Sequence, residues 1–64
     1  MANYMCYIPF QHDMGSISPF VVSSSPIETK EQNALWEINR MRDHDDLPHF
    51  IKLPRGTKFV RVKR

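Results

Sequence analysis

The sequence predicts a small α+β domain in which one helix packs on a three-stranded antiparallel sheet, in the order strand, strand, helix, strand. Three observations indicate this fold. Aromatic and β-branched residues gather near the N-terminus, a helix-capping signature precedes an amphipathic stretch in the middle, and strict alternation ends the chain. The 64 residues are enough for a single domain, residues 1–64, with a thin core.

The first predicted strand covers residues 3–10, and alternation gives it one apolar face. The side chains of that face are Tyr4, Cys6, Ile8 and Phe10. The polar segment 11–15 ends in glycine and suits a hairpin turn. A second strand is expected over residues 16–23, where Pro19 indicates an edge or a broken strand because proline cannot donate to a neighbouring strand.

A helix is predicted from Pro26 to about Arg42. Ser25 is the expected N-cap, Pro26 takes the first helical position, and Glu28 closes a capping box. Helical spacing defines a core-facing stripe. Its members are Ile27, Ala34, Leu35, Ile38 and Met41. Pro48 prevents the helix from continuing further.

Three short segments complete the predicted fold. Residues 50–53 read as an extended piece, and residues 54–57 contain the proline and glycine of a turn. Residues 58–64 alternate as a third strand. A right-handed crossover from the second to the third strand places the first strand in the middle of the sheet.

The alternation of the last strand separates its side chains into two faces. Val60 and Val62 share one face, which we expect to pack beneath the helix. Phe59, Arg61 and Lys63 share the other, which we expect to be the outer face of the sheet.

The net charge of +2 conceals a strong segregation of charge along the chain. Residues 1–25 carry one charged side chain, and residues 26–49 carry three basic and six acidic ones. Residues 50–64 carry six cations and no acid, which indicates an anionic partner. The cations are Lys52, Arg55, Lys58, Arg61, Lys63 and Arg64.

Neither catalysis nor metal binding is expected. His44 and His49 are five positions apart across a proline turn and offer no His-x-x-x-His face on a helix for zinc, so this segment is predicted to be a solvated acidic turn. The single cysteine, Cys6, lies on an apolar strand face and behaves as a small buried hydrophobe. His12 and Asp13 have no nucleophile nearby, and no glycine-rich phosphate loop exists, so we expect no enzyme activity and no cofactor.

Trp36 lies opposite the core-facing stripe and allows two interpretations. The ring could fold against the loop at residues 47–50 with Arg40 stacked on it, which is the preferred interpretation because small domains use their large side chains for packing. Alternatively, Trp36 is an exposed anchor for a protein partner.

Residues 53–56 (Leu-Pro-Arg-Gly) and 59–63 (Phe-Val-Arg-Val-Lys) resemble the end of the small early proteins of T7-like bacteriophages that inhibit host RNA polymerase. Residues 27–29 (Ile-Glu-Thr) also resemble that family's approach to its helix. The resemblance implies the same element order. It also implies that two basic residues engage an acidic surface on the polymerase jaw, in the channel that downstream DNA would occupy. By position these roles fall on Arg61 and Lys63, where the lysine stands in place of the family's arginine.

We therefore expect a non-enzymatic, phage-encoded binding protein that inhibits a host nucleic-acid-processing protein, such as RNA polymerase, by docking its basic last strand onto an acidic surface. Arg61 is the expected main anchor, and Trp36 with Arg40 is a possible second contact on the helix. The supporting residues are Arg55, Lys58, Phe59, Lys63 and Arg64.

Three alternatives remain open for the basic strand. It could bind nucleic acid, with Phe59 and Tyr4 or Tyr7 stacking on bases, although the acidic helix would repel phosphates. The chain could be a structural component of a virion, or the cations could simply protect an edge strand from aggregation. The lone cysteine and the lack of a long apolar run predict a cytoplasmic protein (in a host bacterium, if phage-encoded), monomeric when free and without a membrane partner.

Overall fold

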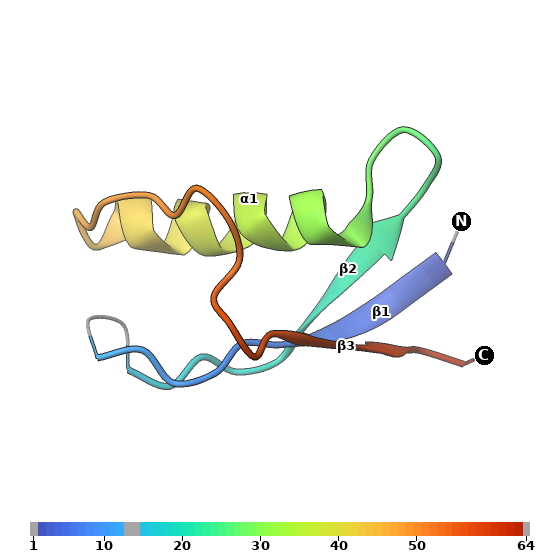
Figure 1. The fold of residues 1–64 in the computed structure, drawn as a ribbon, viewed down its shortest axis with the longest axis horizontal. Helices are drawn as coiled ribbons and strands as arrows, with labels where there is room; N and C mark the ends of the chain where they lie inside the picture. The colour runs from blue at the N-terminus through green and yellow to red at the C-terminus, as the bar shows by residue number, and fades with distance from the viewer. Residues whose placement is uncertain (1, 13–14, 64) are drawn as a thin grey trace.

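A computed structural model of the chain describes residues 2–12 and 15–63. It contains strand β1 (Ala2–Tyr7), strand β2 (Phe20–Ser24), helix α1 (Lys30–His44) and strand β3 (Lys58–Arg61) (Figure 1). The predicted α+β class and the order strand, strand, helix, strand are confirmed.

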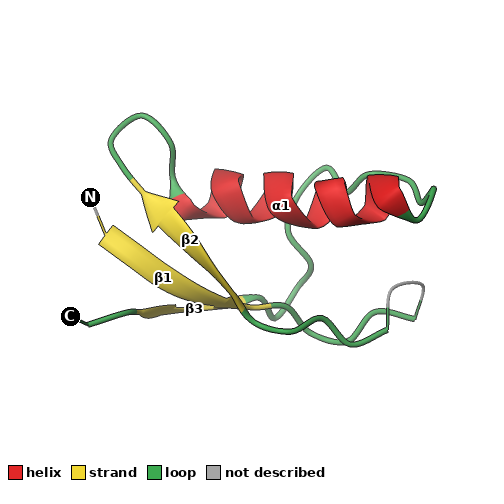
Figure 2. Ribbon diagram, turned by 180° about the vertical axis from the view of Figure 1, so that it is seen from behind, coloured by secondary structure: helices red, strands yellow, loops and turns green. Residues whose placement is uncertain are grey.

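The three strands form one antiparallel sheet in the order β2-β1-β3. The prediction that the first strand lies in the middle is therefore confirmed. Met5 of β1 pairs with Val21 on one side and with Val60 on the other, which fixes the register across the sheet. Helix α1 lies along one face of this sheet, and Figures 1 and 2 show no element over the opposite face.

All three strands are shorter than the sequence predicts, and β3 ends at Arg61 although alternation predicts a strand over residues 58–64. Strand β1 ends at Tyr7, before Pro9, and β2 begins at Phe20, after Pro19. Both boundaries fit the lack of a backbone donor at proline. Toward the tip of the connection, Gln11 and Gly15 form an isolated antiparallel bridge, in which the Gly15 N–H donates to the Gln11 carbonyl at 2.7 Å. The predicted hairpin turn thus begins and ends as expected, while residues 13 and 14 lie outside the described residues.

The helix begins one turn later than predicted. Its N-cap is Thr29, whose Oγ1 accepts from the Gln32 N–H at 3.2 Å, while Gln32 Oε1 accepts from the Thr29 N–H at 3.3 Å. The predicted cap, Ser25, instead accepts from the N–H of Glu28 at 3.0 Å and closes a turn that precedes the helix. Both serine and threonine satisfy the capping pattern, and the reciprocal bond of Gln32 completes the box at the second position.

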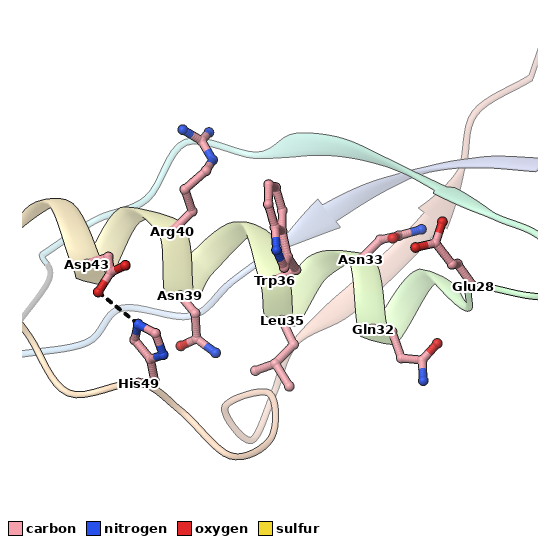
Figure 3. Close-up of a pocket in the computed structure, with 9 residues that line it drawn as sticks. All are labelled: Glu28, Gln32, Asn33, Leu35, Trp36, Asn39, Arg40, Asp43 and His49. Carbon is pink, nitrogen blue, oxygen red and sulfur yellow. Dashed lines mark hydrogen bonds and ion pairs between the residues drawn. The ribbon is translucent and has the colours of Figure 1, made fainter.

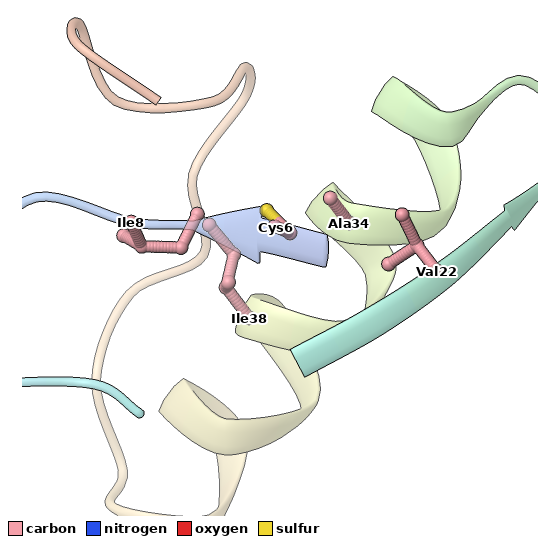
Figure 4. Close-up of a cluster of buried hydrophobic side chains, with 5 residues drawn as sticks. All are labelled: Cys6, Ile8, Val22, Ala34 and Ile38. Carbon is pink, nitrogen blue, oxygen red and sulfur yellow. The ribbon is translucent and has the colours of Figure 1, made fainter. Parts of the chain in front are cut away.

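The core is small and lies between α1 and the sheet (Figure 4). The buried apolar side chains are Cys6, Ile8, Val22, Ala34 and Ile38. The prediction that the helical stripe faces the core is confirmed for Ala34 and Ile38. For Ile27 it is wrong, because this residue precedes the helix and its side chain is 89% exposed. Phe10, predicted on the apolar face of the first strand, lies beyond β1 and is exposed.

The segment from residue 47 to residue 57 returns from the helix to the sheet alongside α1. Residues 50–53, predicted as extended, form no strand; instead Asn39 of the helix holds the backbone of Phe50. The predicted turn at residues 54–57 is confirmed: the Thr57 N–H donates to the Pro54 carbonyl at 3.2 Å, and Gly56 has φ of 95°. This backbone conformation favours glycine in the third position of the turn.

Candidate docking surface at the C-terminal strand

The structure reverses the predicted faces of the last strand. Phe59 pairs with Cys6, and Arg61 pairs with Tyr4. Directly opposed residues of an antiparallel pair share a face. Cys6 is fully buried beneath the helix, so Phe59 and Arg61 lie on the helix side of the sheet.

Val60 lies on the uncovered face, beside Met5, and is 54% exposed. The prediction that Val60 and Val62 pack beneath the helix is therefore wrong. Alternation separates the two sets of side chains correctly, but it does not say which set faces the core. Phe59 decides this here, because its larger apolar surface contributes more when it packs on the core than a valine does.

Phe59 therefore contributes to the packing of the domain rather than to an exposed surface. It is half-buried against the core, and the Lys30 ammonium lies 5.5 Å from the centre of its ring and 5.0 Å from that of Tyr4. Distances of this size allow cation–π attraction between the start of the helix and the two neighbouring strands. Phe59 is thus not the outward-facing apolar contact that the sequence predicts.

Arg61 remains exposed although it lies on the helix side, and its strand forms one edge of the sheet. The Val62 N–H donates to the Asn3 carbonyl at 2.9 Å, so alternate residues of β3 direct their backbone groups toward β1. Phe59 and Arg61 alternate with these residues, so their backbone N–H and C=O groups point away from β1, toward the open edge of the sheet. The open edge therefore offers hydrogen-bonding groups next to a cationic side chain.

Three other predicted cations lie on or beside β3. Lys58 is exposed on the uncovered face, opposite Tyr7, while Arg55 is exposed in the preceding turn and Lys63 just after the strand. Arg64 lies outside the described residues. Within residues 2–12 and 15–63, the ion pairs are Lys30–Glu31, Glu37–Arg40 and Asp43–His49, so none of the C-terminal cations is neutralised by a carboxylate there.

The interpretation that Trp36 packs against the loop beneath Arg40 is wrong. Trp36 is 66% exposed, and Arg40 instead forms two hydrogen bonds to Glu37, the shorter at 2.6 Å. This contact raises the pKa of the Arg40 guanidinium, first through the hydrogen bond and then through the opposite charge. The loop contacts a neighbouring strip of the helix, where the Arg42 guanidinium lies 4.1 Å from the centre of the Phe50 ring.

A shallow depression follows the exposed side of α1 around Trp36 (Figure 3). The side chains that line it diverge: Trp36 and Arg40 point to one side of the helix and Leu35 and Asn39 to the other. The two groups that meet are Asp43 and His49, whose side chains lie 3.0 Å apart. A single carboxylate–imidazole contact at the surface, without a nucleophile, does not form a catalytic arrangement.

Cys6 is the one thiol of the chain, and its side chain is fully buried. Burial disfavours the thiolate and raises the pKa of Cys6 to about 11. The described residues contain no group of three histidine, cysteine, aspartate or glutamate side chains arranged to hold a metal ion.

The uncovered face of the sheet is an apolar surface that was not predicted from the sequence. Val21, Met5 and Val60 form a row across all three strands on that face, and Tyr7 and Val62 flank it. The sequences of β1 and β3 indicate such a surface, because each strand has apolar side chains on both of its faces. One helix can cover only one of them.

Nowhere in the described chain is a helix long and apolar enough to cross a membrane. No family model matches the sequence, and neither a curated protein nor a solved structure does.

Proposed function

We propose that this chain is a non-enzymatic binding protein that docks the basic edge of β3 onto an acidic surface of another protein. The observation that carries the proposal is the position of Arg61: exposed, on an open sheet edge, and without a carboxylate partner among residues 2–12 and 15–63. An arginine guanidinium fits a carboxylate through two parallel hydrogen bonds, which gives both strength and orientation.

The remaining features of the edge support the same mode of binding. Lys63, two residues after Arg61, and Arg55, in the turn before the strand, add positive charge at the two ends of β3, and such charge accelerates encounter with an acidic partner. The outward-facing backbone groups of Phe59 and Arg61 could also pair with an extended segment of the partner, which would add a fourth strand to the sheet.

The resemblance of residues 53–56 and 59–63 to phage inhibitors of host RNA polymerase suggests the partner. A bacterial nucleic-acid-processing protein is the proposed target, with RNA polymerase as the first candidate, and the chain is proposed to be phage-encoded and to act in the host cytoplasm. Its action would be to occupy a surface, which requires no pocket and no chemistry.

The test is the affinity of purified bacterial RNA polymerase for the wild-type protein and for two charge-reversal variants. Arg61→Glu is expected to weaken binding by about 100-fold, because it replaces an attractive contact with a repulsive one. Lys52→Glu makes the same change in net charge at an exposed position away from the edge of β3 and should weaken binding only a few-fold. Equal affinities for wild-type protein and Arg61→Glu would contradict the proposal.

A second candidate function is nucleic-acid binding by the same cations. The observation that favours it is that Arg55, Lys58, Arg61 and Lys63 are all exposed without a carboxylate partner in the described chain. Phe59, however, packs inward and cannot stack on a base. Gel shifts at two salt concentrations separate the candidates, since tight binding of DNA or RNA with a steep salt dependence would favour this second function.

A further inference from the structure

The face of the sheet opposite α1 carries an exposed apolar row that no part of the described chain covers (Figure 2). Val21, Met5 and Val60 are direct cross-strand neighbours, so their side chains form one continuous strip across the sheet. Val21 is 56% exposed and Val60 54% exposed. Single exposed apolar residues are ordinary, but a contiguous group of them marks an interaction surface.

The strip continues toward the C-terminus into a shallow hollow. The hollow is lined by Asn3, Val21, Val62 and Lys63. The apolar surface thus reaches β3, the strand that carries Arg61. Strand β3 therefore carries both the apolar strip and the arginine: Val60 lies on the uncovered face and Arg61 on the helix side of the same open strand.

Among the described residues, the charged side chains of this face are all cationic. Its ionisable cations are Lys58, which is opposite Tyr7, and Lys63, which borders the hollow. The strand residues of the face supply no carboxylate, because their remaining polar members are Asn3 and Ser23. Two copies of this face would bring lysines together, whereas an apolar patch bordered by carboxylates would be complementary to it.

We propose that the uncovered face is the apolar part of the docking surface and that its occupant is a protein patch of apolar side chains bordered by aspartate or glutamate. This inference rests on the proposed function and specifies the chemistry of the partner. Val21, Met5 and Val60 exclude water at the centre of the contact, Lys58 and Lys63 meet carboxylates around it, and Arg61 anchors its edge. Interfaces with this arrangement draw most of their affinity from the dehydrated centre.

The experiment compares purified bacterial RNA polymerase binding by wild-type protein, by the double variant Val21→Thr/Val60→Thr and by the control Ile51→Thr. Threonine keeps the β-branched shape that favours strands, so the sheet should be retained, as circular dichroism will verify. Ile51 is 96% exposed outside the sheet, so its variant removes comparable apolar surface from another place.

The double variant is expected to bind about 30-fold more weakly, and each single variant about fivefold more weakly, while Ile51→Thr stays within twofold of wild type. If the double variant does not fold, the affinities of the two single variants test the same prediction. Wild-type affinity in the valine variants together with loss of binding in Arg61→Glu would overturn this inference and leave the proposed function standing. A wild-type protein that does not bind would overturn both.

Two further measurements exclude other occupants. Sedimentation of wild-type protein over a range of concentrations should show a monomer; self-association that the double variant abolishes would overturn the inference in favour of a second copy. Vesicles of phosphatidylglycerol and phosphatidylcholine should not bind the protein. Vesicle binding that depends on Val21 and Val60 would overturn it in favour of a lipid surface.

Discussion

At the scale of single residues, Asp46 determines how helix α1 ends. Its φ of 60° lies in the left-handed region, which L-residues with a side chain adopt at a cost in free energy. The conformation allows the Asp46 N–H to donate to the Asp43 carbonyl at 3.2 Å and the Leu47 N–H to the Arg42 carbonyl at 2.8 Å. These two bonds define a Schellman motif, in which glycine is the preferred residue at the position of Asp46.

Asp46→Gly is therefore expected to increase the free energy of unfolding by about 0.5–1 kcal/mol, because glycine adopts this backbone conformation without strain and the substitution removes a carboxylate near the negative end of the helix dipole. Urea denaturation measures the change. Asp45→Gly is the matched control: it removes a neighbouring carboxylate, but the φ of Asp45 is −101°, so this variant should be destabilised. A destabilised Asp46→Gly would contradict the prediction.

At the scale of elements, two helical side chains fix the path of the segment that leads to β3. The Asn39 amide donates to the Phe50 carbonyl at 3.0 Å and accepts from the Phe50 N–H at 2.8 Å. Arg42 stacks on the Phe50 ring and also donates to the carbonyl of Pro48. Through these contacts the helix determines where the turn at residues 54–57 lies, and so where β3 begins.

Asn39→Ala is expected to lower the free energy of unfolding by about 2 kcal/mol, because two half-buried backbone groups of Phe50 lose their partners together. Asn33→Ala is the control on the same helix, where one exposed bond to the Ser23 carbonyl is lost and about 0.5–1 kcal/mol is expected. Thermal and urea unfolding of both variants test this ranking. Equal losses would show that the clamp at Phe50 contributes nothing beyond an ordinary surface bond.

The same contacts show what the sequence could and could not predict. The class, the element order and the central position of β1 were predictable, because they depend on local patterns and on the handedness of connections. Which face of β3 packs against the helix could not be predicted, because Val60 and Phe59 are both apolar. Only the packing of Phe59 beneath Lys30 and the helix selects between them. The exposure of Trp36 was equally hidden, because it follows from the bonds that hold the loop at Asn39 rather than beside the indole.

At the scale of the whole molecule, the fold leaves an unusually large surface for its size. The solvent-accessible area is 5033 Å², whereas a compact chain of this mass exposes about 4,300 Å². A single helix over a three-stranded sheet explains the excess, because one sheet face has no cover (Figures 1 and 2). A molecule built in this way has much surface for docking and little core for stability.

The thin core makes the chain sensitive to the loss of one buried side chain. Ile38 is fully buried at the centre of the helix–sheet contact, and Ile38→Ala is expected to lower the free energy of unfolding by about 2–5 kcal/mol. Because domains of this length are stable by only about 3–10 kcal/mol, the variant should lose a large part of its stability and unfold at a much lower urea concentration. Ile51→Ala, which removes the same atoms from a side chain that is 96% exposed, should change the value by no more than about 0.5 kcal/mol. Circular dichroism during urea titration compares the two. Equal stability of the two variants would mean that the buried cluster does not hold this fold together.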